Sequence, residues 1–406
     1  MQRLLDNMRL FWRMASYAAL GFFWVIVLQV FAIKMLPRLG YLAGRPIGND
    51  PPCVKPECDF SDFWRAGLSV RLSPGALAHL PPLNLLPGVQ MPLPGGYHEG
   101  FPYPPPMSLW TVAISHLPFE PGFFVWVGVW LVLAAAVLRW AGLSWPVVAA
   151  GLLSPAALWN IELGQMGVIG GALLVAGLLR AASSPLCAGG LLGLLACKPQ
   201  IGIMVPAMLL GGRSWRGILG FAFAVLGLCL LTLALFGWPL WHDYLNGGRH
   251  GASSLLTAPF VPSLDKSTGV SVFWMMRSLQ LGVAQAALVQ AISSAAAMLA
   301  VCFIWRRQDL PGLDAVTLTV LLSLLATPYG YVDDMVAWSI VLVALAERRG
   351  WRIGMLDVLF WIWPMACQIV SEQTGILFTP LVVLLALARE VREGGLLQRR
   401  KAVRLA

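Results

Sequence analysis

Residues 217–237 read GILGFAFAVLGLCLLTLALFG, an unbroken apolar stretch with no charged side chain. A helix needs about 20 apolar residues to cross the hydrocarbon core of a bilayer. Two arginines, Arg213 and Arg216, precede the stretch, and basic residues commonly flank such a helix on one side of the membrane. The stretch therefore predicts a transmembrane helix.

The rest of the chain repeats this pattern. Of its 406 residues, 58% are hydrophobic and 12% are charged, and the mean hydropathy is +0.74. Soluble domains carry about 25% charged residues. We therefore expect an all-α polytopic membrane protein with about 12 transmembrane helices, whose candidate spans are 14–36, 121–140, 146–159, 165–182, 186–198, 200–212, 217–237, 280–305, 312–327, 333–347, 353–370 and 374–389.

The distribution of the basic residues indicates a membrane protein rather than a protein that binds a polyanion. The formal net charge is +9, but the basic residues stand in short clusters between apolar runs. This pattern is typical of cytoplasmic loops and does not favour nucleic-acid binding. It predicts a multi-pass protein of the inner (plasma) membrane with both termini in the cytoplasm. Residues 1–390 form the transmembrane domain, and 391–406 form a basic tail expected to contact anionic lipids.

Two long loops then face the outside, 37–120 and 238–279. The first is rich in Pro and Gly and cannot be one continuous helix, although 62–72 and 106–117 can form short interfacial helices. Cys53 and Cys58 lie in this loop. They can form a disulfide if the compartment is oxidising, and otherwise they are two free thiols.

Carboxylates gather on the expected outer face, and Asp59 is the leading candidate for chemistry. It opens the sequence Asp59-Phe60-Ser61-Asp62-Phe63-Trp64, so a short helix places Asp59, Asp62 and Phe63 on one face. A carboxylate beside an apolar wall can accept a proton from a hydroxyl group. The alternative is that Asp59 caps the helix.

Three other polar positions stand out near the ends of apolar runs. Lys198 is a lone charge between two spans, and it either contacts a phosphate group or extends to the lipid headgroups. Asp333 and Asp334 open a span, where they either bind sugar hydroxyls or a cation, or simply stabilise a helix start. A third group, Asn160, Glu162 and Gln165, can bind substrate or cap a helix.

The aromatic residues and the missing motifs indicate which ligands the protein can bind. Tyr103, Trp64, Trp110 and Trp241 can stack on a sugar face. The five histidines lack metal-ligand spacing, so we expect no metal site and no cofactor. The chain contains no phosphate-binding loop for a nucleotide. A donor used on the outer face is therefore expected to be lipid-linked.

Four landmarks in order resemble glycosyltransferase family 87 of the GT-C superfamily. They cover most of 55–245 and are Asp59-Phe60-x-x-Phe63-Trp64-x-Ala66-Gly67, Phe101-x-Tyr103-Pro104-Pro105, Asn160-x-x-x-Gly164-Gln165 and Gly189-x-x-x-Gly193-x-x-x-x-Lys198-Pro199-Gln200. The resemblance implies a GT-C-type bundle that transfers a hexose, mannose by family default, from a polyprenyl-phosphate-linked sugar donor to a lipid or glycan acceptor on the periplasmic side.

The resemblance also implies residue roles. Asp59 would be the general base of an inverting transfer, and Lys198 would steady the departing lipid phosphate. We expect the substrate-binding residues to be Asp62, Tyr103, Asn160, Gln165, Asp333 and Asp334 in addition to Lys198. Asp62 lies close to Asp59 in sequence, which leaves the identity of the base open. Mannosyltransferases of the family carry paired histidines where this chain has Asp333 and Asp334, which leaves the sugar, the acceptor and metal independence open. The alternatives from other classes are a transporter or flippase and a non-catalytic assembly protein.

Overall fold

The structure is a computed structural model that describes residues 11, 14–25, 27–29, 31–32, 35–36, 59–72, 101–248, 256–257, 259–261, 264–307 and 312–393. Cys53, Cys58, most of the first loop and the tail beyond 393 lie outside these residues. The disulfide and the lipid contacts of the tail therefore stay predictions.

Helices account for the fold, and no strand occurs among the described residues. The first half contains α2 (Asp59–Leu72), α3 (Ser108–Ile114), α4 (Phe119–Trp140), α5 (Trp145–Leu152), α6 (Pro155–Leu163), α7 (Gly167–Arg180), α8 (Pro185–Gly193), α9 (Val205–Gly211) and α10 (Trp215–Asp243). The second half contains α12 (Leu264–Ser267), α13 (Val272–Ser278), α14 (Val283–Arg306), α15 (Gly312–Ala326), α16 (Val336–Arg348), α17 (Met355–Thr374) and α18 (Thr379–Glu393). Short 3-10 turns cover Pro105–Met107, Leu194–Cys197 and Val332–Met335.

The expected spans are confirmed in part. Among the described residues α4, α10 and α14 are long and apolar enough to cross a membrane, as expected at 121–140, 217–237 and 280–305. The expected span 146–159 is instead broken into α5 and α6, which meet at an angle of 53°. Ser154-Pro155 causes the break, because Ser154 Oγ caps the new helix by accepting from Ala157 N at 3.2 Å. Likewise, only Val205–Gly211 of the expected span 200–212 is α-helical.

Some helices are buried in the centre of the bundle, and others expose apolar side chains at its surface. Helix α7 is central, and its residues from Gly167 to Leu178 are all buried; α15 and α16 are buried to a similar degree. Helices α10 and α14 instead expose apolar side chains, for example Phe223 at 69% and Leu299 at 72%. Side chains this apolar are stable on the surface only when lipid covers them, so the protein is embedded in a membrane.

Small residues bring α8 and α10 together. A Cβ atom on Gly189 would lie 2.0 Å from the carbonyl oxygen of Gly217. Only glycine permits this approach of two helix backbones, which is a common way for helices to associate in lipid. The Gly189-x-x-x-Gly193 part of the fourth landmark therefore has a packing role.

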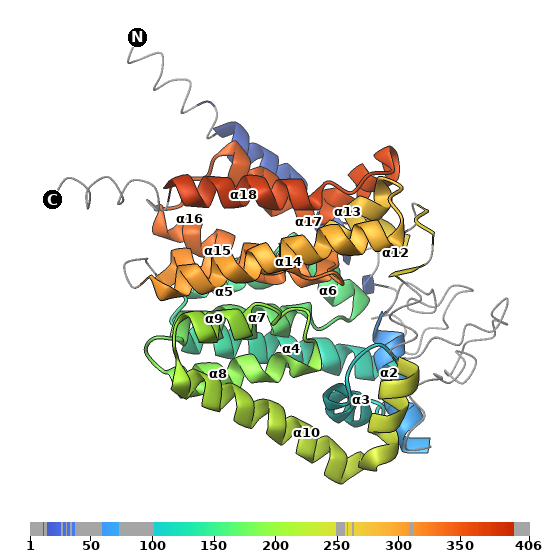
Figure 1. The fold of residues 1–406 in the computed structure, drawn as a ribbon. Helices are drawn as coiled ribbons and strands as arrows, with labels where there is room; N and C mark the ends of the chain where they lie inside the picture. The colour runs from blue at the N-terminus through green and yellow to red at the C-terminus, as the bar shows by residue number, and fades with distance from the viewer. Residues whose placement is uncertain are drawn as a thin grey trace.

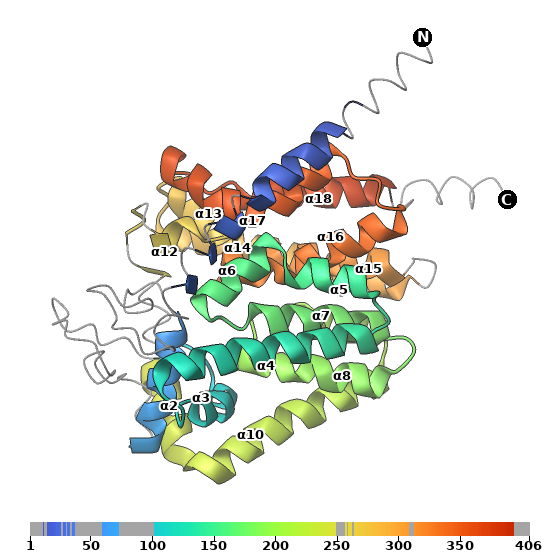
Figure 2. The same ribbon diagram turned by 180° about the vertical axis from the view of Figure 1, so that it is seen from behind.

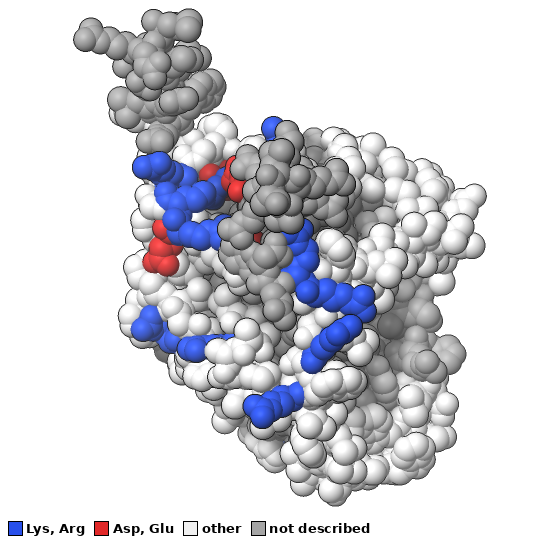
Figure 3. Space-filling model, turned by 60° about the vertical axis from the view of Figure 1, so that its left-hand side comes forward, with Lys and Arg blue, Asp and Glu red and all other residues white. Residues whose placement is uncertain are grey.

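The two ends of the bundle differ in charge. Helices α2 and α12 lie at one end in Figures 1 and 2. At the opposite end, α4, α7, α14, α16 and α18 finish with arginines in their last turns, namely Arg139, Arg180, Arg306, Arg348 and Arg392. Figure 3 views this end and shows Lys and Arg spread across it with few acidic residues. We call the two ends the α2 end and the arginine end.

Helix α2 belongs to the protein core rather than to its surface. A helix over 62–72 is confirmed and begins at Asp59. Its Phe60 and Phe63 are fully buried, and the Phe60 ring lies 5.5 Å from that of Phe123. Helix α3 falls within the expected 106–117 and packs beside α2. The aromatic face of α2 therefore packs against protein at one end of the bundle.

Candidate active site

The turn between α6 and α7 delivers Gln165 into the interior. Helix α6 ends at Gly164, whose φ of 69° suits glycine, and Gln165 N donates to Asn160 O at 2.9 Å. Trp126 on α4 donates from its Nε1 to Gly164 O at 2.8 Å and fixes the turn. The Gln165 side chain is consequently held at a defined place beside α2.

Gln165 connects Asp59 with Tyr103. Its Nε2 donates to Asp59 Oδ2 at 2.8 Å and to Tyr103 Oη at 3.0 Å. The Tyr103 ring is held by aromatic neighbours, with the Phe63 and Phe101 centroids each 5.1 Å away. After Tyr103, the extended Pro104 leads into the 3-10 turn at Pro105–Met107. The Tyr-Pro-Pro landmark therefore orients the tyrosine hydroxyl toward the site.

Lys198 forms the centre of a buried ionic group. Its Nζ lies 2.5 Å from Asp333 Oδ2 and 2.8 Å from Asp334 Oδ1, and it donates to Gln165 Oε1 at 3.2 Å. Lys198 is only 4% exposed, so its side chain does not extend to headgroups. Buried ionic groups are costly unless they are paired and hydrogen-bonded, and this one is both.

Two segments hold the aspartates against Lys198. Thr268–Val270 of the second long loop pairs with the segment before Asp333, where Val270 N donates to Gly330 O at 2.9 Å and Val332 N donates to Thr268 O at 3.0 Å. On the other side, Asn160 Nδ2 donates to Asp333 O at 3.4 Å, and its Oδ1 accepts from Val168 N at 3.2 Å. Asn160 is 1% exposed, and both of these contacts are with backbone.

Burial makes Asp59 a weak acid. Removal from water raises the pKa of Asp59 to about 8, and the carboxylates of Asp333 and Asp62 act in the same direction. The hydrogen bond from Gln165 and the charge of Lys198 lower this pKa in part. A carboxyl group that titrates near neutral pH suits proton transfer. Burial also raises the pKa of the Tyr103 hydroxyl, which therefore stays protonated.

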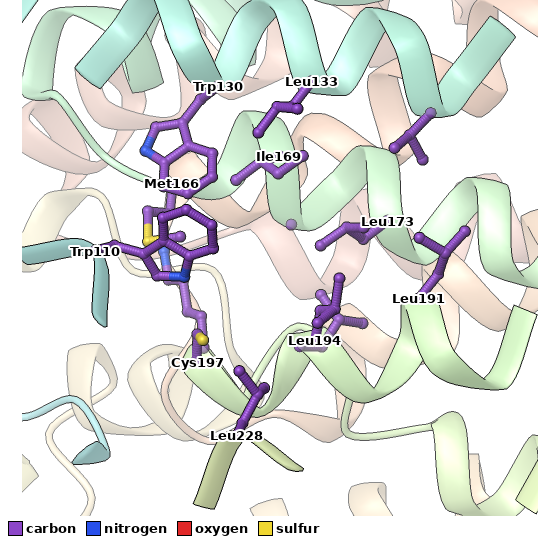
Figure 4. Close-up of a pocket in the computed structure, with 14 residues that line it drawn as sticks. Trp110, Trp130, Leu133, Met166, Ile169, Leu173, Leu191, Leu194, Cys197 and Leu228 are labelled. Atoms are coloured by element: carbon purple, nitrogen blue, oxygen red, sulfur yellow. The ribbon is translucent and has the colours of Figure 1, made fainter. Parts of the chain in front are cut away.

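An apolar cavity of about 160 Å³ reaches Lys198 from between the helices. Its lining comes from α3, α4, α7, α8 and α10 and includes Trp110, Trp130, Ile169, Leu173, Leu194 and Leu228. Figure 4 shows Trp110, Trp130 and Met166 gathered at one side of the cavity and Leu173, Leu191 and Leu194 at the other. Since Lys198 also contributes to the lining, the cavity places an apolar space beside a buried ammonium group.

Most of the predicted site residues come together, whereas Asn160 bonds to backbone and Asp62, Trp64 and Trp110 make other contacts. Asp59, Tyr103, Gln165, Lys198, Asp333 and Asp334 form one connected group. Asp62 pairs instead with Arg65 on α2. Trp64 is 7% exposed and donates to Leu117 O at 3.0 Å, so its ring is used in packing. Trp110 lines the cavity and packs against Trp130.

The described residues contain no group of three or more His, Cys, Asp or Glu suited to a metal ion. The sequence interpretation missed Trp126, which fixes the Gly164 turn, and the residues that line the cavity. Gly164 next to an isolated Gln165 is a signal for the turn, because glycine commonly ends a helix. No sequence pattern predicted the cavity, because its lining residues come from five helices that are separate in the sequence.

Comparison with known proteins identifies one family. The model of glycosyltransferase family 87 matches residues 101–328, more than half of the chain. That range contains Tyr103, Gln165 and Lys198 and ends just before Asp333. No curated protein and no solved structure matches the chain.

Proposed function

Because this chain belongs to glycosyltransferase family 87, we propose that it transfers a hexose from a polyprenyl-phosphate donor to a lipid or glycan acceptor. Family membership and the apolar helices make it a membrane glycosyltransferase. Mannose is the proposed sugar, following the family resemblance. The donor, the sugar and the acceptor are the parts that we propose.

One observation carries this proposal: Lys198 belongs both to the polar network of Asp59 and to the lining of the apolar cavity. A polyprenyl phosphate has the matching chemistry, an apolar chain that ends in a charged phosphate group. We place its first isoprenoid units in the cavity and its phosphate at the Lys198 side. The sugar then lies within reach of Asp59.

The proposed reaction is a direct displacement with inversion. Asp59 in its ionised form accepts the proton of an acceptor hydroxyl. The hydroxyl oxygen forms a bond to C1 of the sugar while the bond between C1 and the phosphate oxygen breaks. The polyprenyl phosphate leaves with the bonding electrons, and Lys198 stabilises its negative charge. Asp59 ends the step protonated.

Charge balance determines how the donor enters. Lys198 faces Asp333 and Asp334, so the group already carries more negative than positive charge. An anionic phosphate must therefore replace one carboxylate as the partner of Lys198. The displaced aspartate becomes free to accept hydrogen bonds from sugar hydroxyls.

The remaining assignments follow from this arrangement. Tyr103 and Gln165 lie beside Asp59, and Asn160 braces the backbone of Asp333. The charge of Asp62 repels that of Asp59 and raises the pKa of the base. The arginine end faces the cytoplasm under the positive-inside rule, and the α2 end faces the periplasm. We place the protein in the inner membrane with both termini on the cytoplasmic side.

A donor panel tests the proposal. The purified protein in lipid nanodiscs is incubated with a membrane lipid extract and, in turn, with polyprenyl-phosphate-linked mannose, glucose and galactose, and with GDP-mannose and UDP-glucose. Products are identified by mass spectrometry. We expect transfer from at least one polyprenyl-phosphate sugar and none from the nucleotide sugars. Transfer from a nucleotide sugar alone, or from no donor, contradicts the proposal.

A further inference from the structure

Gln165 is placed differently from every other neutral side chain of the site. It lies on the turn between α6 and α7, yet its amide contacts Asp59 from α2, Tyr103 from the segment before α3, and Lys198 from the corner before α9. Its Oε1 also accepts from Met166 N at 3.2 Å. One amide thus joins four segments that are distant in sequence.

The chemistry of its partners fixes the orientation of this amide. An ammonium group has only donors, so Lys198 must meet Oε1. An ionised carboxylate has only acceptors, so Asp59 must meet Nε2. The two contacts measure 3.2 Å and 2.8 Å. A flipped amide would oppose donor to donor and acceptor to acceptor, which makes the network directional from Lys198 to Asp59.

We propose that Gln165 is a positioning residue that aims the Asp59 carboxylate at the acceptor hydroxyl and conveys the charge of Lys198 to it. This inference rests on the proposed function, in which Asp59 is the base. The Lys198 ammonium polarises the amide through Oε1 and strengthens the hydrogen bond that Nε2 donates to Asp59. Gln165 itself need not touch the sugar or the acceptor.

The surroundings of Asp59 explain why such a residue is needed. Asp62 on its own helix and Asp333 on the facing segment both repel its charge, and burial adds to this effect. Tyr103 Oη bonds to Gln165. Lys198 acts against the repulsion, but it is committed to Asp333 and Asp334. The Gln165 amide is therefore the hydrogen-bonded route by which the ammonium favours the ionised base.

Gln165→Met tests the inference, because methionine has a similar length and lacks both amide groups. Without the donated bond the ionised form of Asp59 is less favoured, so its pKa rises further. Loss of one hydrogen bond to a charged group corresponds to a shift of about one pH unit. We expect a loss in transfer rate of about tenfold at pH 7 and little loss at pH 9.5.

Gln290→Met is the matched control. Gln290 is a buried glutamine that also makes several hydrogen bonds, to Phe273 N, Leu325 O and Ala326 O. These contacts are with backbone and not with Asp59. Its replacement is expected to lower the melting temperature and to leave the midpoint of the pH–rate profile unchanged.

The assay uses polyprenyl-phosphate mannose carrying a radiolabelled sugar and a membrane lipid extract, with the wild type, both variants and Asp59→Asn in nanodiscs from pH 5.5 to 9.5. A profile of Gln165→Met displaced to higher pH supports the inference. A profile that is lowered equally at every pH overturns it, because that result indicates a structural role alone. Transfer by Asp59→Asn at the wild-type rate, or none by the wild type, contradicts the proposed function instead.

Discussion

A cluster of charged side chains lies at each of the two ends of the helix bundle, and the two clusters differ in composition and burial. At the α2 end, the Lys198 cluster consists of Lys198, Asp333 and Asp334, with Asp59 joined through Gln165; the side chains of the ion pairs are 4% to 7% exposed. At the arginine end, the Arg389 cluster consists of Arg349, Arg389, Asp357 and Glu393, whose side chains are 12% to 52% exposed.

The two clusters differ in the ratio of cations to acids and in their exposure to water. In the Arg389 cluster, Asp357 is paired with both Arg349 at 2.6 Å and Arg389 at 2.9 Å, so two cations face two acids. In the Lys198 cluster one cation faces two aspartates directly and a third through an amide. An ionic cluster that only stabilises the fold does not need more buried acids than cations, as the Lys198 cluster has. We propose that the Lys198 cluster serves the transfer reaction and that the Arg389 cluster serves structure and orientation.

Removal of the single cation of the Lys198 cluster should have the largest effect. Lys198→Met leaves Asp333 and Asp334 buried side by side without a cation. Loss of one partner from a buried ionic group costs about 3–5 kcal/mol. We expect a large fall in melting temperature in detergent. In the remaining folded protein the apparent KM for the donor should rise more than that for the acceptor. Equal changes in both constants argue against a phosphate at Lys198.

The pH dependence of transfer should report on the Lys198 cluster as well. In the proposed reaction Asp59 acts as the base only when it is ionised, and its pKa is raised to about 8. The transfer rate should therefore rise with pH between about 6 and 9, by about tenfold for each unit below the pKa. Initial rates at saturating donor measure this directly. A rate that is flat across this range contradicts the assignment of Asp59 as the base.

The smallest effect is expected at the arginine end. Arg349→Met removes one of the two cations beside Asp357, and Arg389 remains at 2.9 Å. Partly exposed ion pairs contribute about 1 kcal/mol or less. The melting temperature should change little and the transfer rate should match that of the wild type. A loss as large as that of Lys198→Met would remove the distinction between the two clusters.

The sequence predicted the features that depend on short stretches of residues. The long apolar runs predicted α4, α10 and α14, and four landmarks led to the family that the comparison confirmed. The proline at 155 was a visible reason to divide the span 146–159, yet hydropathy alone did not show the break. The number of membrane crossings stays a prediction, because several helices are too short to be judged by length.

What the sequence could not supply is which polar group meets which. Lys198 was equally compatible with headgroups or a phosphate, and only the fold shows that it pairs with aspartates 135 and 136 residues later. Asn160 and Gln165 were grouped together as substrate-binding residues. The structure separates them, because Asn160 is bonded to backbone whereas Gln165 joins Asp59 to Lys198.

One measurement tests the central claim most directly: sugar transfer from polyprenyl-phosphate mannose by Asp59→Asn, beside Asp62→Asn as the matched variant on the same helix. Asp62 is paired with Arg65, whereas Asp59 faces Gln165. Loss of a general base lowers rates by about 10²–10⁴-fold. We predict a loss of this size for Asp59→Asn, a much smaller loss for Asp62→Asn, and unchanged melting behaviour in both. Turnover by Asp59→Asn at the wild-type rate would contradict the account.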